Sequence, residues 1–195
     1  YCIDGGEEKS CDDIGCPDGT TIIVRNLFYN TPARRKFLKT AATEAAYIND
    51  LAGRLALSHP DVSFKFINNN QNRLHTSGNG NLRDIIYQIY GRDTAAGSVV
   101  SFYAFMLMSI PMVHFVRNTK AADGGSFPNI GKPILSRGNR TWENYFINGR
   151  YIKSNIITKA IEDAYKTFVM IHKYPFTAFH IEVDPVLIDV NVHPR

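Results

Sequence analysis

Residues 19–38 carry the sequence GTTIIVRNLFYNTPARRKFL, which predicts a strand followed by the start of a helix. The β-branched run Thr20–Val24 comes after the turn signal Asp18-Gly19 and is typical of a buried strand. Further along, Asn30-Thr31-Pro32 places a polar capping residue before a proline, whose missing N–H costs nothing in the first turn of a helix. We therefore expect a helix to begin there.

The rest of the chain alternates between helical and strand patterns. Apolar residues recur at helical spacing over 41–56, over 82–90 before Gly91, and from a capping Asn155 to Phe168. Strand patterns cover 62–66 with a return at 73–76, two strands within 99–116, 145–147 joined to 151–152 by the turn Asn148-Gly149-Arg150, 178–183 and 187–192. Because helices and strands alternate without repeats, we expect one α/β or α+β domain.

The composition is that of an ordinary globular protein. The chain has 195 residues, of which 44% are hydrophobic and 21% charged, with a mean hydropathy of −0.20. These values exclude a disordered or collagen-like chain. The apolar stretch 98–116 is interrupted by Pro111 and His114, so we expect no membrane span and no membrane partner.

Three cysteines, Cys2, Cys11 and Cys16, lie in the first sixteen residues. An odd number fits a reducing compartment better than a disulfide framework, so we expect a cytoplasmic protein. The spacing disfavours a zinc site, because the nearest histidine is His59. Because the chain starts at Tyr1 rather than at a methionine, we expect it to be part of a longer protein.

Positive charge is concentrated in two segments. The net charge is only +4, and residues 1–18 hold six acids against Lys9. Two segments with a net charge of +5 each follow: the first basic cluster is Arg25, Arg34, Arg35, Lys36 and Lys39, and the second is Lys132, Arg137, Arg140, Arg150, Lys153 and Lys159 with Glu143 as its single acid. They predict contact with a nucleic-acid backbone if they share a face; two unrelated solvated surfaces are the alternative.

Three segments, in order, resemble the MutL family of DNA mismatch-repair proteins. They are residues 19–38, Phe146–Arg150 (FINGR) and Asp189–Pro194 (DVNVHP). The resemblance covers most of the chain and is weakest between residues 97 and 129. It implies the transducer domain that follows an ATP-binding module in such GHKL-type ATPases, a two-layer α/β sandwich similar to the second domain of ribosomal small-subunit protein five. The apolar run 102–108 departs from the family pattern, and a buried central strand or a partner-binding edge would explain it.

The resemblance also implies a domain organisation. We expect an acidic leading segment over 1–18 and a single transducer domain over 19–195, with the upstream ATP-binding domain and the downstream C-terminal domain absent from this chain. The sequence motifs of the ATP-binding module are not found in this sequence, and neither is a Walker-type phosphate loop. We therefore expect no catalysis, cofactor or metal in this chain, and ATP and Mg²⁺ only in the full-length protein.

The motif at the end of the chain belongs, in the family, to a nucleotide-sensing loop. A lysine of that loop reaches the γ-phosphate, and the chain stops at Arg195 before it. We expect Asn191, His193 and Pro194 to support the shape of this loop rather than to perform proton chemistry.

The resemblance places a DNA-binding surface near the helix that follows Asn148-Gly149-Arg150. We therefore expect Arg150 and Lys153 to bind phosphates, because helix starts also offer free N–H groups. Arg34, Arg35 and Lys36 are further candidates, and their alternative role is structural pairing with the ATP-binding module or with nearby acidic residues. The loop residues Arg137 and Arg140 are candidates as well. Tyr145, Phe146 and Tyr151 are predicted either to stack on bases or to lie in the core.

Together these features predict a DNA mismatch repair function. The chain would couple ATP binding in the adjacent module to dimer closure and would bind DNA without sequence preference. A protein–protein docking module of the same ATPase class is the alternative. Expected partners are DNA, the ATP-binding module of the parent chain and, through the full-length protein, a MutS-like mismatch-recognition protein. We expect a monomeric fragment of a cytoplasmic, nucleoid-associated bacterial protein.

Overall fold

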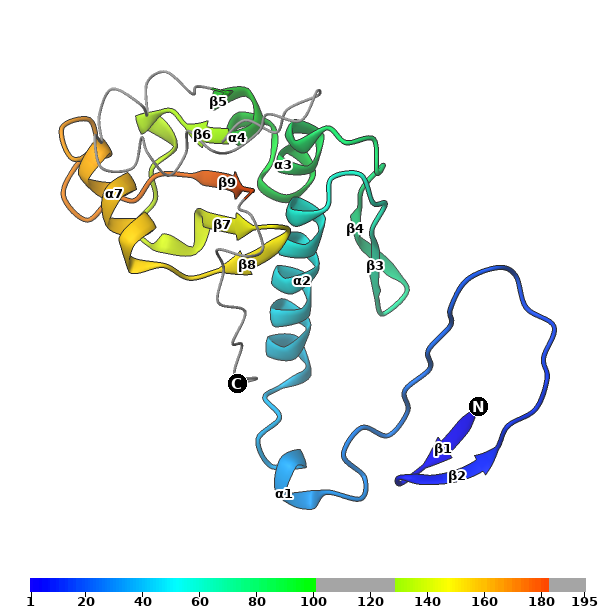
Figure 1. Cartoon of the computed structure of the whole chain (residues 1–195). Helices are drawn as coiled ribbons and strands as arrows, with labels where there is room; N and C mark the ends of the chain where they lie inside the picture. Colours follow the sequence, from blue (N-terminus) through cyan, green and yellow to red (C-terminus); the bar gives the residue numbers. More distant parts are fainter. Residues whose placement is uncertain (101–128, 183–195) are drawn as a thin grey trace. The chain divides into compact units, whose positions relative to one another are not determined.

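The computed structural model describes residues 1–100 and 129–182 (Figure 1). Of the two strands predicted within 99–116, only residues 99 and 100 are described, and they lie in a strand over Ser98–Val100. The predicted strand 187–192 and the loop residues Asn191, His193 and Pro194 lie outside the described ranges. The chain divides into two compact units, residues 1–46 and 47–195, and each is described here by itself. The expected boundary between residues 18 and 19 falls inside the first unit, and the domain limits stay a prediction.

The first unit begins with an antiparallel hairpin of β1 (Cys2–Asp4) and β2 (Glu7–Ser10). The Tyr29 hydroxyl donates a hydrogen bond of 2.6 Å to Asp4 Oδ1, which ties the loop before the first helix to this hairpin. The strand predicted over Thr20–Val24 is wrong, because this stretch forms no strand and the side chain of Ile22 is 81% exposed. A β-branched run becomes a strand only when a neighbour supplies its hydrogen bonds, and no described segment pairs with it.

The predicted helix start at Pro32 is confirmed, but the helix is short. Helix α1 (Pro32–Arg35) ends after four residues, and α2 (Ala41–Ser58) begins as a separate element. The break has a local cause: Thr43 N–H donates to Thr40 Oγ1 and Lys39 N–H donates to Glu44 Oε1, which caps a second helix start at Thr40. Helix α2 ends before His59-Pro60, as expected.

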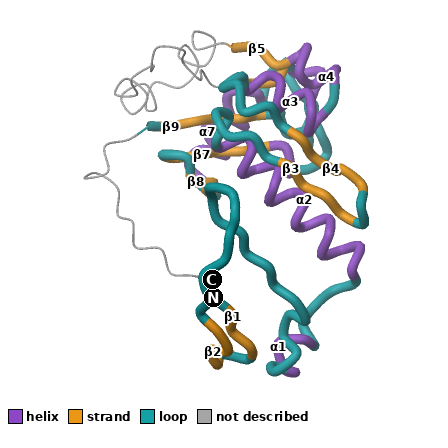
Figure 2. Tube along the Cα trace, turned by 90° about the vertical axis from the view of Figure 1, so that its right-hand side faces the viewer, coloured by secondary structure: helices purple, strands orange, loops and turns teal. Residues whose placement is uncertain are grey.

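The second unit combines helices with a five-stranded mixed sheet. Its other elements are β3 (Lys65–Asn68), β4 (Gln71–His75), α3 (Leu82–Tyr90), α4 (Arg92–Gly97), β5 (Ser98–Val100), β6 (Asn129–Gly131), η1 (Pro133–Leu135), η2 (Arg140–Trp142), β7 (Glu143–Ile147), β8 (Arg150–Ile152), α7 (Asn155–Tyr165) and β9 (Thr177–Ile181). The sheet has the order β5-β6-β9-β7-β8; β7 and β9 are parallel, and the other pairs are antiparallel. Figure 2 shows β5, β9, β7 and β8 from a second side. The expectation of a mixed α+β fold is confirmed.

Local signals place most of these elements. Asn81 caps α3 by accepting from Arg83 N–H, and Gly91 stops the same helix with a φ of +87°. The β3–β4 hairpin turns at Asn69 and Asn70, both at positive φ. The predicted strand over 62–66 begins three residues late, at Lys65.

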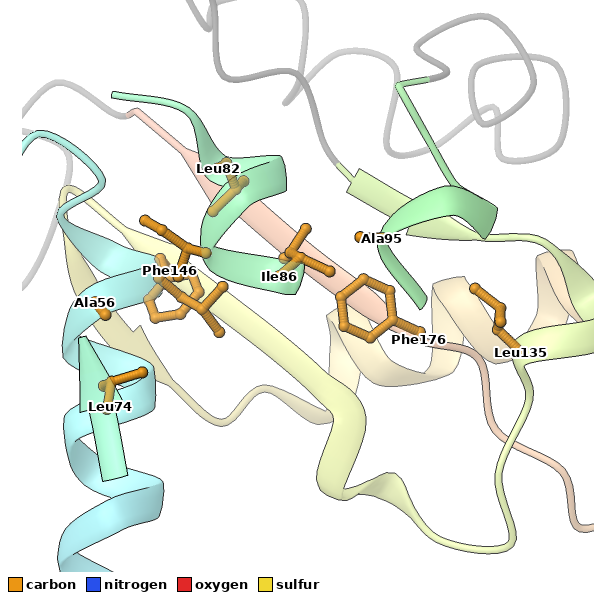
Figure 3. Close-up of a cluster of buried hydrophobic side chains, with 11 residues drawn as sticks. Ala56, Leu74, Leu82, Ile86, Ala95, Leu135, Phe146 and Phe176 are labelled. Atoms are coloured by element: carbon orange, nitrogen blue, oxygen red, sulfur yellow. The ribbon is translucent and has the colours of Figure 1, made fainter. Parts of the chain in front are cut away.

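The sheet carries apolar side chains on both faces. Phe146, Phe176 and Ala178 pack with Leu57 and Ile86 from α2 and α3 (Figure 3). On the opposite face, a second cluster joins the sheet to α7: Tyr145, Phe179, Ile181, Ile157 and Ile161. Helices therefore cover both faces of the described sheet, which differs from the two-layer arrangement that the resemblance implied.

No helix among the described residues is both long and apolar enough to cross a bilayer.

Candidate nucleic-acid interface

The β7–β8 hairpin presents Arg150 at its turn. Ile147 pairs with Arg150 across the two-residue turn, in which Asn148 has a φ of 47° and Gly149 a φ of 76°. This confirms the predicted Asn-Gly turn, whose central residues both need positive φ. A Cβ on Gly149 would lie 2.9 Å from His59 Cε1, so the turn also packs closely against the end of α2. Arg150 is exposed at the first position of β8.

Two of the three aromatic residues that the sequence offered for base stacking belong to the core. Tyr145 is 3% exposed and Phe146 is fully buried. Tyr151 is half-buried beneath the guanidinium of Arg54, which lies 4.3 Å from the ring centroid and pairs with Asp50. The core alternative is therefore confirmed for Tyr145 and Phe146.

Lys153 stands immediately before helix α7 and is exposed. The helix is capped by Ser154, whose Oγ accepts from Ile157 N–H, and not by Asn155 as predicted. It ends at Tyr165, short of the predicted Phe168. The pattern of an α-helix leaves the amides of Asn155 and Ile156 without an intrahelical acceptor, so this end attracts anions.

A hollow of about 470 Å³ lies beside this helix start. We call it the α7 hollow; it is lined by Arg140, Glu143, Tyr145, Tyr151, Ile152, Lys153, Ser154, Asn155, Thr158, Lys159 and Glu162. It brings two predicted phosphate ligands, Arg140 and Lys153, to one place and adds Lys159. Arg150 is not among the lining residues.

Arg140 is already engaged within the protein. Its Nη2 donates to Glu162 Oε2 at 3.1 Å, and its guanidinium lies 4.3 Å from the centroid of the Tyr174 ring. The hydrogen bond with Glu162 raises the pKa of Arg140 above its already high ordinary value. Arg140 therefore shapes one wall of the hollow through Glu162, while Lys153 and Lys159 are exposed and have no ion pair with another described residue.

Glu143 is a buried carboxyl in the wall of the hollow. It is 5% exposed; the Tyr145 hydroxyl donates to its Oε2 at 3.0 Å, and its Oε1 has no partner among the described residues. Burial raises the pKa of Glu143 to about 7, and the negative charge of Glu162 acts in the same direction, while the Tyr145 hydrogen bond and Arg140 oppose the shift. Glu143 thus exchanges its proton near neutral pH.

The remaining predicted residues lie elsewhere. Arg137 rests on the Trp142 ring, 4.1 Å from its centroid, and its backbone forms an isolated bridge with Tyr174. Arg34 and Arg35 occupy the last turn of the short α1 and not the first turn of a long helix, and Lys36 follows it. All three are exposed in the first unit and have no ion pair with another described residue. Their pairing with the ATP-binding module stays a prediction.

Sequence reasoning counted Lys159 in the second basic cluster without naming it as a phosphate ligand, and it did not recognise Glu143 or Glu162 as site residues. A signal existed for two of them, because Asn155, Lys159 and Glu162 follow one another at helical spacing on α7. Glu143 gave no comparable signal, because its burial depends on the pairing of β7 with β9, whose partner residues lie thirty-four positions away.

Comparison with known proteins finds a match over the segment that contains the hairpin and helix just described. Residues 128–195 match the family profile described as "DNA mismatch repair protein, C-terminal domain". The whole chain aligns with the DNA mismatch repair protein MutL of Agathobacter rectalis at 55% identity over 194 residues. Over its whole length the chain is therefore similar to MutL proteins.

Other MutL proteins align over nearly the same length. The protein from Clostridium perfringens is 43% identical over 98% of the chain, and that from Thermoanaerobacter pseudethanolicus is 35% identical over 98%. The chain spans only 27% of the Agathobacter MutL, 26% of the Clostridium MutL and 29% of the Thermoanaerobacter MutL. These similarities agree with the resemblance to MutL proteins that the three motifs carry.

Proposed function

We propose that this chain acts in DNA mismatch repair as a transducer domain that couples ATP binding in an adjacent module to dimer closure. In this proposal the transducer domain occupies residues 19–195 of the chain and binds the DNA backbone without sequence preference. ATP and Mg²⁺ are assigned to the adjacent module, as the resemblance implies. A MutS-like protein would act through the full-length protein. The names of the MutL relatives support the part of this proposal that concerns DNA mismatch repair.

The exposure of Arg150 and Lys153 at the two ends of one short segment carries the DNA-binding part. Strand β8 spans Arg150–Ile152, so the Cα atoms of Arg150 and Lys153 lie about 10 Å apart along the chain, which is close to the rise of about three phosphates in one DNA strand. Neither cation has an ion pair with another described residue. Both are therefore free to replace counterions on a phosphate backbone.

Fluorescence anisotropy against labelled duplexes of several lengths tests this proposal. We expect log affinity to fall linearly with log salt concentration, and the double charge reversal Arg150→Glu/Lys153→Glu to weaken binding by roughly tenfold or more and to lower the salt slope by about 2. The matched control is Lys65→Glu/Arg73→Glu, which reverses the same two residue types at exposed positions of the β3–β4 hairpin. Equal losses in both variants, or no binding at low salt, would contradict a DNA surface at β8.

A protein–protein docking module is the second candidate, and one surface of α2 favours it. Tyr47, Ile48, Leu51 and Leu55 are 62%, 50%, 58% and 43% exposed and follow one another at helical spacing. A docking module would show no dependence of affinity on DNA length. The same anisotropy series therefore separates the two candidates.

A further inference from the structure

The loop between α7 and β9 exposes three large apolar side chains. Phe168, Met170 and Ile171 are 59%, 80% and 86% exposed. We call residues Lys166–Lys173 the α7–β9 knob, and Figure 1 shows this loop on the side of the second unit away from α2. Single exposed apolar residues are common on protein surfaces, whereas three within four residues indicate a surface that a partner covers.

Backbone hydrogen bonds hold the knob at both ends. The N–H groups of Phe168 and Val169 donate to the Tyr165 carbonyl at 2.8 Å and 3.1 Å, which ties the start of the knob to the end of α7. Just after the knob, Tyr174 and Arg137 exchange two backbone hydrogen bonds of 2.8 Å. Because its ends are held, the knob loses little conformational freedom when a partner binds.

The tip of the knob is a tight turn. The Lys173 N–H donates to the Met170 carbonyl at 3.0 Å, so Ile171 and His172 are the central residues of a four-residue turn. His172 has a φ of 64°, the positive value that the third position of such turns often needs. A turn of this kind brings its first and fourth Cα atoms within about 7 Å of each other, so the tip that carries Met170 and Ile171 is narrow.

The charge around the tip is positive. Lys166 and Lys173 flank the apolar residues, and both are exposed. Neither has an ion pair with another described residue, and residues 164–181 contain no aspartate or glutamate. Charge complementarity therefore calls for a partner that combines an apolar receptor with negative charge on both sides of it.

The size of the knob favours DNA over a protein as this partner. A stable protein interface uses about 20–30 residues on each side, far more than the knob offers. The minor groove of a duplex is about 6 Å wide and is bordered by phosphates, so it suits a narrow apolar tip between two lysines. Proteins that bend DNA insert phenylalanine, isoleucine or methionine between base steps in this groove.

We propose that the α7–β9 knob is an apolar wedge that inserts Met170 and Ile171 between two base pairs in the minor groove, while Lys166 and Lys173 bind the flanking phosphates. Insertion unstacks one base step and bends the duplex, and it is least costly at flexible pyrimidine–purine steps such as TA. This inference rests on the proposed function, because it adds a base contact to the phosphate contacts of Arg150 and Lys153.

One duplex can reach both the knob and the β7–β8 turn. Thr177, at the start of β9, pairs with Glu143 at the start of β7, and the knob precedes β9. Arg150 follows the other end of β7. The five residues of β7 span roughly 17 Å, which is the length of about five base pairs.

The first test measures the affinity of the 195-residue chain for a labelled duplex with a central TA step, by fluorescence anisotropy over a salt series. We expect Ile171→Ser to weaken binding by roughly five- to tenfold and to leave the salt slope unchanged, because an apolar contact releases no counterions. The matched control is Ile67→Ser, since Ile67 is 52% exposed on β3. Equal affinities of Ile171→Ser and the wild type would overturn the wedge.

A charge variant tests the two lysines separately. We expect Lys166→Gln/Lys173→Gln to lower the salt slope by about 2, because two phosphate contacts are lost. Lys65→Gln/Arg73→Gln on the β3–β4 hairpin is the matched control and should keep the slope of the wild type. A slope that stays unchanged in Lys166→Gln/Lys173→Gln would refute the phosphate contacts of the knob.

The second test detects unstacking directly. The adenine of the TA step is replaced by 2-aminopurine, whose fluorescence increases when the base loses its stacking neighbours. We expect the wild type and Ile67→Ser to raise this fluorescence at saturating protein, and Ile171→Ser to leave it near the value of the free duplex. Saturation by the wild type without an increase would overturn the wedge.

The two proposals fail in different ways. Duplex binding that depends on Arg150 and Lys153 but is the same in Ile171→Ser and the wild type would overturn the wedge, leave the proposed function standing and assign the knob to a protein contact. Absence of duplex binding by the wild type at low salt would overturn the DNA surface and the wedge together.

Discussion

At the scale of single residues, Asn144 shows how β7 accommodates a polar group in the core. It is 1% exposed, and its Nδ2 donates to the Tyr90 hydroxyl at 2.8 Å and to the Thr177 carbonyl at 3.4 Å. We expect Tyr90→Phe to lower the free energy of unfolding by about 1–2 kcal/mol, because it removes the better acceptor of a buried amide. Urea unfolding measures this. Tyr87→Phe, at a half-exposed position of the same helix, should change stability little, and an equal loss there would refute the explanation.

The residues of the site were predictable to different degrees. The positions of Arg150 and Lys153 could be predicted, because the Asn-Gly turn and the helix start beside them are local sequence signals. In the structure Arg150 begins β8 after that turn and Lys153 lies just before α7. Glu143 could not be recognised, because a glutamate next to a basic segment normally lies in solvent. Its burial follows from the packing of α7 over β7 and β9.

At the scale of elements, the β7–β8 turn sets the position of Arg150. Gly149 has a positive φ, and a side chain there would also meet the His59 ring. We expect Gly149→Ala to lower the free energy of unfolding by roughly 1–2 kcal/mol and to weaken duplex binding. Gly138→Ala is the control, since no atom within 4 Å would meet its Cβ. Unchanged melting and binding in Gly149→Ala would show that the turn tolerates the strain.

Elements with local signals were predicted well, and those that depend on distant partners were not. Helix α3 and both Asn-containing hairpins appear where caps and turns place them. Thr20–Val24 has the composition of a strand but no described partner. The helix that begins at Pro32 ends at Arg35, and a separate helix begins after Thr40. The parallel pairing of β7 with β9 has no sequence signature of its own.

At the scale of the whole molecule, two titratable groups on the same sheet, the buried Glu143 and the half-buried His180, give the free energy of unfolding opposite pH dependences. Burial lowers the pKa of His180 to about 4, whereas the unfolded chain has a histidine pKa of about 6.5. The contribution of His180 to the free energy of unfolding is therefore present above pH 6.5 and is lost as the pH falls toward 4. Glu143 has a pKa raised to about 7, so stability falls as the pH rises from about 4.5 to 7. Between about pH 4.5 and 6.5 the two groups therefore change the free energy of unfolding with pH in opposite directions.

Removing one group should therefore reveal the other. We expect the stability of Glu143→Gln to rise by about 1–2 kcal/mol more than that of the wild type between pH 5 and pH 6.5, because only the His180 slope remains. Urea unfolding at a series of pH values measures the difference. Asp163→Asn replaces an exposed acid of α7, and its stability profile against pH should run parallel to that of the wild type. A Glu143→Gln profile that is also parallel would show that burial does not raise the pKa of Glu143.

The position of β9 has a consequence for how the chain acquires its structure during synthesis. Strands β5 and β6 form one antiparallel pair and β7 and β8 another, and β9, the last described strand along the chain, lies between the two pairs. Until Thr177–Ile181 has left the ribosome, the two pairs cannot join, and each keeps an open edge. A nascent or truncated chain that ends before residue 177 therefore exposes two sheet edges, which are the sites where self-association would begin.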